Sequence, residues 1–269
     1  MFHSLLPFEE EAVNLYRGEK KYIKYRLLNL LYRRSMLLAD GLLFSSSFTE
    51  NKFLSSLSTA RRPVSKVIPF GTWSSFSKPT APIEIGSGQT VRFLYVSNFY
   101  KYKRHLMLIP LFEDLIRRGY NISLTLCGDG FTHTAEITEA VSKSVAGGRI
   151  SYEGKLTHDK MQAVYQQHDV LIFPSVVESF GIPLIEAAHE NLWIIFTWPP
   201  LVEIMQNNNY HRYTLAQGNL EEEVRNLIDS HNAGNLNLKE KKSNSHFITF
   251  RHTFTQTMHY LESFLPKSN

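Results

Sequence analysis

The sequence predicts an α/β fold built on a doubly wound, Rossmann-like parallel sheet. Between Val91 and Phe196, apolar runs of strand length alternate with segments whose apolar residues recur at helical spacing. The run 170–173 is continuously hydrophobic, as expected for a strand covered on both faces. Ligands of such sheets bind beyond the carboxyl ends of the strands, so we expect the functional residues there.

The alternation allows each element of this central part to be assigned in order. The expected strands are 91–96, 122–127, 150–152, 170–173 and 192–196. The expected helices are 105–118, 134–144, 158–167 and 183–189. Repeated βα units of this kind specify a sheet with helices on both faces.

In the N-terminal part, residues 1 to about 88, the sequence pattern predicts only half of a second α/β domain. It contains a basic, aromatic-rich helix over 20–40, a strand over 41–44, and a strand and turn over 67–71. Ser47 and Glu50 have the spacing of a capping box that opens a further helix. A linker rich in Ser, Pro and Gly follows over 72–90, and the tail 247–265 is expected to be helical.

These elements divide the chain into three parts. We expect a partial N-terminal domain with its linker over 1–88 and a complete ligand-binding domain over 89–245. The C-terminal helix, within 246–269, is expected to pack back on the N-terminal part.

Composition excludes several classes of protein. A single cysteine cannot form an internal disulfide or a thiolate zinc site. No apolar run reaches the length that spans a bilayer, and the first residues lack a secretory signal pattern, so we expect a cytoplasmic chain.

The net charge is +4, and the excess lies in residues 1–90, with 12 basic and 7 acidic side chains. So small and local an excess does not favour a nucleic-acid partner.

The most informative segment is 174–186, which follows the strand 170–173 and enters a helix. This places Glu178 on the loop at the carboxyl end of the sheet and Glu186 within the helix. Two carboxylates there suit the paired hydroxyls of a sugar and a ribose. The backbone amides at the helix start would point toward an anion; they belong to Phe180, Gly181 and Ile182. The alternative is that Glu178 is a helix-capping acid and Glu186 a solvated helix residue.

Residues 174–187 match the pattern P-S-x-x-E-x-F-G-x-P-x-x-E-A at every fixed position. The segment therefore resembles the retaining glycosyltransferases of family 4, which have the GT-B fold of two facing Rossmann-like domains. The resemblance implies transfer of a sugar from a nucleotide diphosphate donor, with no obligatory metal or other cofactor. It also implies that Glu178 contacts the donor sugar and Glu186 the ribose.

Family members place an arginine and a lysine after the first strand of the donor domain, where they hold the diphosphate. Here Lys103 stands at the lysine position and Asn98 at the arginine position, which removes one charge. Lys101 or Arg104 could substitute for it. Without the motif that contains Glu178 and Glu186, these basic residues after the strand 91–96 would be interpreted as an exposed basic loop.

The resemblance extends to weaker signals. Gly128 and Gly130 form a lone G-x-G at a strand end, which a tight turn also explains. His3 resembles a strand-end histidine of the first domain, although it stands at the terminus. Asn191 replaces a common glycine and tolerates the same left-handed conformation. The donor-binding set implied is Asn98, Gly128, Gly130, Ser179, Phe180, Gly181, Ile182 and Glu186, and the catalytic set is Glu178, Lys103 and His3.

The resemblance implies a retaining glycosyltransferase that acts on a glycan or polyprenyl-linked acceptor. The N-terminal segment is most similar to bacterial enzymes that build surface polysaccharides, so the expected pathway is synthesis of an O-antigen or a capsule. Family members have about a hundred more residues before this point, so the N-terminal domain is expected to be partial. A noncatalytic nucleotide-sugar-binding fragment, or a subunit of a split enzyme, is the main alternative. A GT-B phosphorylase or epimerase is the third.

The basic helix over 20–40 allows two interpretations. Its cations and apolar residues suit the anionic inner face of the cell membrane, where the chain would be peripheral. A helix that packs on its own sheet with a solvated basic face explains the same residues.

Overall fold

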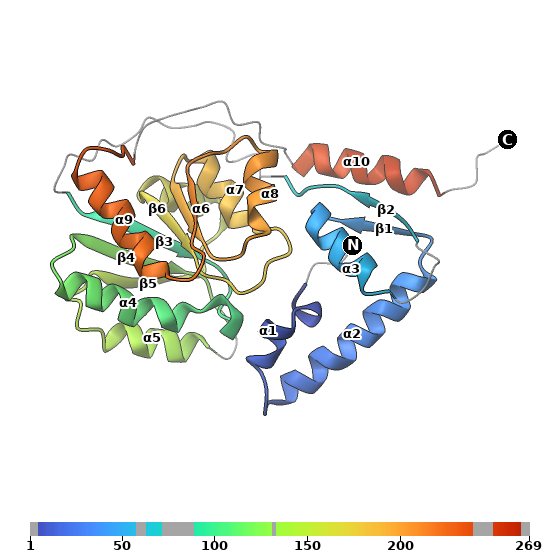
Figure 1. Cartoon of the computed structure of the whole chain (residues 1–269), viewed down its shortest axis with the longest axis horizontal. Coiled ribbons are helices and arrows are strands. Elements are labelled where there is room, and N and C mark those ends of the chain that lie inside the picture. The colour runs from blue at the N-terminus through green and yellow to red at the C-terminus, as the bar shows by residue number, and fades with distance from the viewer. Residues whose placement is uncertain (1–4, 58–62, 72–88, 131–132, 239–249, 265–269) are drawn as a thin grey trace. The chain divides into compact units, whose positions relative to one another are not determined.

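The structure, a computed structural model, describes residues 5–57, 63–71, 89–130, 133–238 and 250–264 (Figure 1). The chain forms two compact units. The larger unit comprises Ser75–Val176 and Pro183–Ser245. The smaller unit comprises Met1–Ser74, Val177–Ile182 and His246–Asn269.

The larger unit contains a six-stranded parallel sheet with the strand order β5-β4-β3-β6-β7-β8. Its strands are β3 (Val91–Val96), β4 (Ile122–Cys127), β5 (Ile150–Gly154), β6 (Val170–Phe173), β7 (Trp193–Phe196) and β8 (Tyr213–Leu215). The strand order runs outward in opposite directions from the β3–β6 pair, which makes this pair the point where the topology reverses. The expected doubly wound, Rossmann-like sheet is confirmed.

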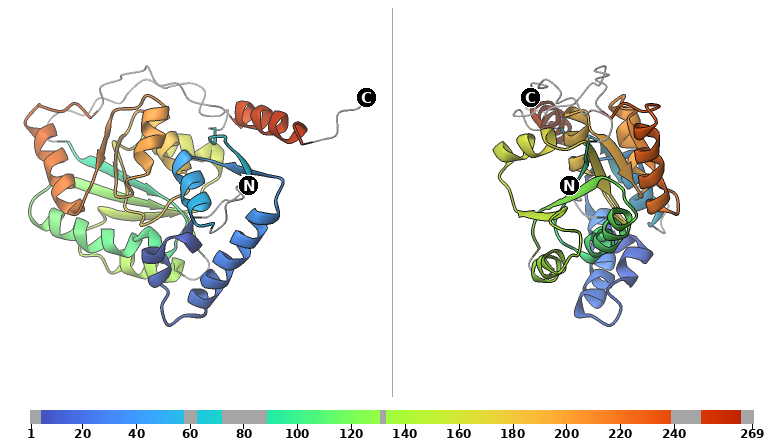
Figure 2. Two further views of the ribbon diagram at one scale, coloured as in Figure 1. Left: turned by 45° about the vertical axis from the view of Figure 1, so that its right-hand side comes forward. Right: turned by 90° about the vertical axis from the view of Figure 1, so that its left-hand side faces the viewer.

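Helices cover both faces of this sheet. They are α4 (His105–Arg117), α5 (Thr134–Ser142), α6 (His158–Gln166), α7 (Ile182–His189), α8 (Leu201–Asn207) and α9 (Leu220–Asn232), with a short 3₁₀ turn, η3 (Lys101–Lys103). Right-handed crossovers on the two sides of the reversal place α4 and α5 on one face and α7 and α8 on the other (Figure 2). The strand β8 and the helices α8 and α9 extend the fold beyond the elements predicted from the sequence.

The two strands at the reversal are joined by a buried ion pair. Asp169 directly precedes β6, and its Oδ2 accepts hydrogen bonds from Arg92 N at 2.9 Å and Arg92 Nε at 3.0 Å. Its Oδ1 accepts a third from Arg92 Nη2 at 3.0 Å. The Asp169 side chain is fully buried, whereas that of Arg92 is about one-third exposed. Because the β3–β6 ladder pairs only Phe93 with Val170 and Leu94 with Leu171, this contact sets much of the register.

The smaller unit is built on two short parallel strands, β1 (Gly41–Phe44) and β2 (Val64–Val67). The other elements are η1 (Leu6–Phe8), α1 (Glu10–Asn14), α2 (Lys20–Leu38), α3 (Ser47–Ser55) and α10 (Phe250–Glu262). Adjacent residues of a strand point to opposite faces. Leu43 accordingly forms a buried cluster with Ile68 and Tyr260 of α10, while the Phe44 ring lies 5.6 Å from that of Phe53 on α3.

Two predictions about this unit are wrong in position. The residue that caps α3 is Ser46 rather than Ser47, because the Ser46 Oγ accepts the hydrogen bond from Thr49 N at 3.2 Å. The second strand covers 64–67 rather than 67–71, since Pro69 has no amide proton to continue the ladder. The predicted linker over 72–90 lies almost entirely outside the described residues.

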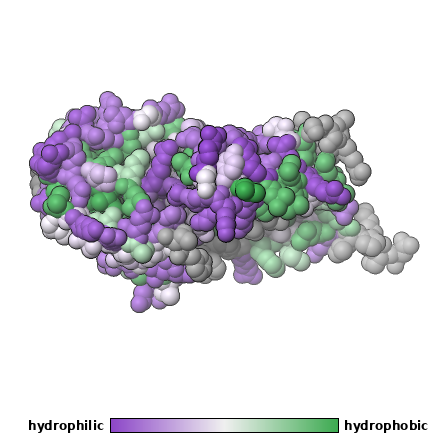
Figure 3. Space-filling view, turned by 90° about the horizontal axis from the view of Figure 1, so that it is seen from below, coloured by the Kyte–Doolittle hydropathy of each residue, from purple (hydrophilic) through white to green (hydrophobic). Residues whose placement is uncertain are grey.

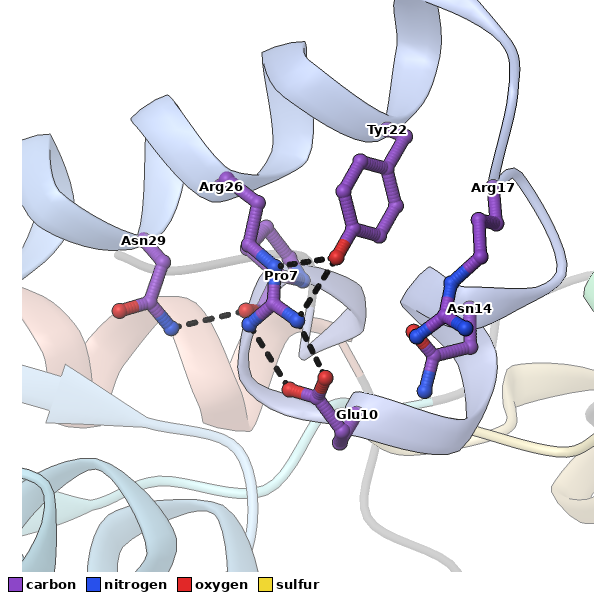
Figure 4. A network of polar contacts seen from close by, with 7 residues as sticks. All are labelled: Pro7, Glu10, Asn14, Arg17, Tyr22, Arg26 and Asn29. Atoms are coloured by element: carbon purple, nitrogen blue, oxygen red, sulfur yellow. Dashed lines mark hydrogen bonds and ion pairs between the residues drawn. The ribbon is translucent and has the colours of Figure 1, made fainter.

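The helix α2 is held to the N-terminal turns by a polar network (Figure 4). Arg26 makes a two-pronged ion pair with Glu10 and also donates to the Tyr22 hydroxyl at 3.1 Å. Asn29 Nδ2 donates to the Pro7 carbonyl at 2.8 Å. One of the predicted surface cations is therefore used within the unit.

The opposite face of α2 is exposed and mixed: its cations are solvated, as in the interpretation of a helix with a solvated basic face, but apolar side chains are exposed with them. Ile23 is 71% and Leu38 76% exposed. The exposed apolar residues of this face, called here the apolar stripe, are Ile23, Leu27, Leu30, Leu31 and Leu38. Lys20, Lys24 and Arg34 lie among them. In Figure 3, seen from below, hydrophobic and hydrophilic surface adjoin over α2. No helix among the described residues is long and apolar enough to cross a membrane.

The Asp169→Ala substitution should lower the free energy of unfolding by about 3 kcal/mol, because it leaves the Arg92 side chain and amide without their carboxylate. Chemical denaturation followed by far-UV circular dichroism measures the change. The control is Glu139→Ala, which removes an exposed ion pair with Lys143 and should cost less than about 0.5 kcal/mol. Equal effects of the two substitutions would contradict the structural role given to Asp169.

Candidate functional site

The carboxyl group of Glu186 is buried in the larger unit, and its pKa is strongly raised. It lies on α7 with a residue exposure of 4%, and its Oε2 accepts a hydrogen bond from the buried Tyr165 hydroxyl on α6 at 2.8 Å. Burial raises the pKa of Glu186 to about 7, and the Tyr165 hydrogen bond opposes part of that rise. The alternative of a solvated helix residue is therefore wrong. Near neutral pH this group exchanges between a hydrogen-bond donor and a carboxylate that accepts hydroxyls.

The loop between β6 and α7 carries the other acid of the motif, Glu178, which is partly exposed. The loop belongs to the smaller unit. Gly181 adopts a φ of 78°, a left-handed conformation that explains the glycine at this position. The adjacent Phe180 is buried, and its ring meets that of Phe70 edge to face at 5.3 Å.

Lys103 lies at the end of η3, after β3, and is 8% exposed. Its Nζ is 5.2 Å from the centre of the Tyr102 ring and 5.4 Å from that of Phe173, the last residue of β6. The Lys103 carbonyl accepts a hydrogen bond from Tyr95 at 2.7 Å. These contacts place the ammonium group at the carboxyl end of the sheet. Because Lys103 is buried, the alternative interpretation of an exposed basic loop does not apply to it.

The residues that could replace the missing arginine differ in their surroundings. Asn98 and Lys101 are exposed. Arg104 adopts a left-handed φ of 57° and borders a cavity of about 410 Å³ at the ends of β7 and β8. Thr197, Ala216 and Asn219 also line this cavity, which includes none of the donor-binding residues predicted from the sequence.

The two glycines of the G-x-G sequence are needed because two loops approach closely. A Cβ on Gly128 would lie 1.9 Å from the Ser97 carbonyl oxygen, and one on Gly130 would lie 2.4 Å from that of Phe99. The backbone N–H of Phe99 donates to the Asp129 carbonyl at 2.7 Å, which ties the loops after β3 and β4 together. These loops thus form one supported surface at the strand ends.

His105 supports this surface, although no sequence pattern singles it out. Its ring lies 4.4 Å from the rings of both Tyr95 and Phe99, and its Nε2 is 3.1 Å from the Ser97 hydroxyl. Burial, with the nearby Lys103 charge, lowers the pKa of His105 to about 3, so the ring is neutral. Tyr165 was likewise missed as the partner of Glu186, because helical spacing does not show which face of α6 meets α7.

The remaining predicted positions have separate outcomes. His3 lies outside the described residues. Asn191 adopts a φ of 64°, which confirms the left-handed conformation expected after α7. Within the described part of the chain, no three His, Cys, Asp or Glu side chains are grouped so that they could hold a metal ion.

The parallel sheet with its reversal at β3–β6 defines the larger unit as a Rossmann-like domain. Residues 82–244 match the family described as "Glycosyl transferases group 1". This match covers more than half of the chain, so the chain belongs to the glycosyl transferases group 1 family.

Comparison with individual proteins gives partial matches. The gpi3 subunit of phosphatidylinositol N-acetylglucosaminyltransferase from Schizosaccharomyces pombe is 26% identical over 102 residues, which are 38% of this chain and 22% of that protein. Anabaena HepE, solved with UDP and glucose, is similar with a TM-score of 0.65 and 17% identity over 88% of this chain and 66% of HepE.

The lipopolysaccharide outer core galactosyltransferase WaaB, solved in its apo form, has a TM-score of 0.57 and 16% identity. The match covers 97% of this chain and 66% of WaaB. The chain thus spans about two thirds of these two structures and matches less than a quarter of the curated relative. At these identities the structural likeness shows the GT-B type of fold.

Gly130→Ala should lower the free energy of unfolding by about 2 kcal/mol, because the added methyl group overlaps backbone atoms of Phe99 that cannot move aside. Thermal or urea unfolding measures the effect. The matched control, Gly147→Ala, has open space around the added carbon and a φ of 61°, so only the cost of the left-handed conformation, about 1 kcal/mol, is expected. A smaller effect at Gly130 than at Gly147 would refute the close approach.

Proposed function

We propose that this chain binds a nucleoside diphosphate sugar and takes part in retaining glycosyl transfer. The observation that carries the proposal is the buried Glu186, held by Tyr165, eight residues after Glu178 in a chain that belongs to the glycosyl transferases group 1 family. The UDP and glucose in the HepE structure support a nucleotide sugar as the ligand class.

Each predicted residue has a chemical role in this proposal. Glu186 accepts the ribose hydroxyls, and Glu178 accepts hydroxyls of the donor sugar. Lys103, together with the amides of Phe180, Gly181 and Ile182, stabilises the leaving diphosphate. Losing such a cation from a dry site costs on the order of 3 kcal/mol in the barrier. The acceptor hydroxyl attacks from the face that the nucleotide leaves, which retains the anomeric configuration.

The remaining predicted residues have supporting roles. Gly128 and Gly130 let the loops after β3 and β4 pack closely, and in this proposal they support the surface that the donor contacts. Asn98 provides an uncharged contact where the family has an arginine, and His3, which lies outside the described residues, is assigned to the sugar by the family resemblance alone. No metal is assigned to the reaction.

We further propose that the acceptor is a glycan or a polyprenyl-linked sugar and that the pathway builds a surface polysaccharide such as O-antigen or capsule. Similarity of fold to WaaB, whose name refers to the lipopolysaccharide outer core, supports this assignment. In the corresponding division of the chain, 89–245 binds the donor, 1–88 is a partial acceptor-side domain, and 246–269 packs on that domain. The reaction would take place in the cytoplasm.

A noncatalytic fragment or a subunit of a split enzyme is the second candidate. Asn98 removes a cation, and in the described residues β1 pairs only with β2 while the apolar stripe of α2 is exposed. A subunit would bind the donor but transfer no sugar until its partner chain is added. Transfer by the purified chain alone would refute this candidate. Turnover of a nucleotide sugar without any acceptor would instead favour an epimerase.

UDP-glucose should bind about tenfold more tightly at pH 8 than at pH 6, because the ionised Glu186 carboxylate accepts ribose hydroxyls much more strongly than the neutral carboxyl group and its pKa is raised to about 7. Isothermal titration calorimetry measures the dissociation constants. UDP-glucose is the probe because its diphosphate has no group that titrates in this range. If it does not bind, GDP-mannose provides the same test for a guanine donor.

The Glu186→Gln variant should bind the donor more weakly at pH 8 and lose the pH dependence. The matched control is Glu190→Gln, which changes a carboxylate at the end of the same helix, where it accepts hydrogen bonds from Gln162 and Gln166. It should bind like the unaltered chain. A pH dependence that persists in Glu186→Gln would contradict the role given to this residue.

We also propose that the apolar stripe and its cations rest on the anionic inner face of the cell membrane. The chain should sediment with vesicles of phosphatidylcholine and phosphatidylglycerol, and less with phosphatidylcholine alone. Replacing Lys20, Lys24 and Arg34 by alanine should lower the affinity on the order of hundredfold, at about 1 kcal/mol per cation. The control is Lys160→Ala, which removes an exposed cation of α6 in the larger unit and should change the affinity little. Equal binding to both vesicles would refute an electrostatic contact.

A further inference from the structure

We propose that Ser45, Ser46 and Thr49 are positioning residues for the loop between β6 and α7. These three side chains, called here the hydroxyl cluster, hold the carbonyl of Ser179 and thereby orient the peptide that leads into Phe180. The inference rests on the proposed function, because it concerns the loop that carries Glu178 and the amides assigned to the diphosphate.

The hydroxyl cluster is buried and converges on one atom. The Ser179 carbonyl oxygen lies 3.2 Å from Ser45 Oγ, 3.0 Å from Thr49 Oγ1 and 3.4 Å from Ser46 Oγ. All three residues are at most 4% exposed. They come from the turn between β1 and α3 and from the first turn of α3 itself. The loop that contains Ser179 belongs to the same compact unit.

Helix capping explains only part of this cluster. Ser46 Oγ accepts the Thr49 amide as the cap of α3 and lies 2.8 Å from Thr49 Oγ1. A helix cap needs no hydroxyl at position 45. The cap by Ser46 also gives no acceptor to the hydroxyl protons of Ser45 and Thr49. Buried hydroxyls require partners, and a carbonyl oxygen accepts two hydrogen bonds. Ser45 and Thr49, which make the two shorter contacts, are the donors that fit this requirement.

Fixing the Ser179 carbonyl also fixes the next amide. The peptide bond is planar and trans, so the N–H of Phe180 points opposite to the Ser179 C=O. With the carbonyl directed into the hydroxyl cluster, the Phe180 N–H is directed away from it. Two further contacts steady the loop, since Leu5 N donates to Ser179 Oγ at 3.0 Å and the Phe180 ring packs on Phe70.

The expected consequence is selective. Without the two donors, the Ser179–Phe180 peptide can rotate, and the amide assigned to the diphosphate loses its direction. The left-handed Gly181 that follows gives the loop the freedom to do so. The ribose contact through Glu186 does not depend on these hydroxyls. Binding of a phosphate-containing ligand should weaken, while the packing of the two-stranded sheet is kept.

The test compares the full chain with a Ser45→Ala, Thr49→Val double variant, which keeps the Ser46 hydroxyl. Nitrogen-15 relaxation should show the order parameters of the Phe180 and Gly181 amides falling from about 0.85 to below about 0.6. The amide of Ile68, which donates to the Phe44 carbonyl at 2.8 Å, serves as the internal reference for a folded unit. Calorimetry should show UDP-glucose affinity reduced about tenfold, which corresponds to one charge-assisted hydrogen bond.

Two further variants separate positioning from simple loss of a hydroxyl. Ser55→Ala removes a hydroxyl of α3 that bonds the Lys52 carbonyl at the surface, and it should leave both measurements unchanged. Thr49→Ser keeps the donor and should behave like the unaltered chain. If the double variant also loses the order of Ile68, the single Ser45→Ala variant replaces it, with a smaller change in the same direction.

The outcomes distinguish the inference from the proposed function. Unchanged order at Phe180 in a folded variant overturns the positioning role. A fall in order together with unchanged UDP-glucose affinity also overturns it, because the loop would then not serve the donor. If order falls but no nucleotide sugar binds even the unaltered chain, the proposed function fails while the orienting effect of the hydroxyl cluster stands.

Discussion

Parallel pairing of the six strands is the constraint on which the larger unit depends. It gathers the carboxyl ends of all six strands at one edge, so that residues from distant segments, such as Lys103 and Gly130, enter the same surface. The reversal between β3 and β6 needs a strong local contact because few residues pair there, and the Arg92–Asp169 ion pair supplies it. At the opposite ends of the strands, side chains are released from the ladder and become available for binding.

The surface at the strand ends combines rigid loops with a carboxyl group that titrates near neutral pH. The neutral His105 and the close contacts of Gly128 and Gly130 fix two loops against each other, which leaves little reorganisation for ligand binding. Two opposing effects set the pKa of Glu186. Burial disfavours its charge, and the Tyr165 hydroxyl restores part of it, so the group titrates near neutrality. A ligand that brings hydroxyl donors would complete the stabilisation of the carboxylate.

The smaller unit is stabilised differently, because its sheet has only two described strands for helices to pack against. Side-chain networks therefore provide much of its order, from the Arg26–Glu10 pair on α2 to the hydroxyl cluster at the start of α3. The side of α2 that faces its own unit carries tyrosines and the buried Met36 besides its polar network, while the exposed side combines the apolar stripe with Lys20, Lys24 and Arg34. The exposed apolar stripe is the observation on which the proposed membrane contact rests.

The sequence by itself determined the order and type of most central elements, since strands 91–96, 122–127 and 170–173 follow directly from local apolar patterning. It also determined the family, through the spacing of Glu178 and Glu186. Only the tertiary structure decided that Tyr165 meets Glu186, that Ser46 rather than Ser47 caps α3, and that three hydroxyls converge on Ser179. Local periodicity shows which face of an element is apolar. It does not show which distant backbone or side chain meets that face, because such contacts form only when separate segments pack together.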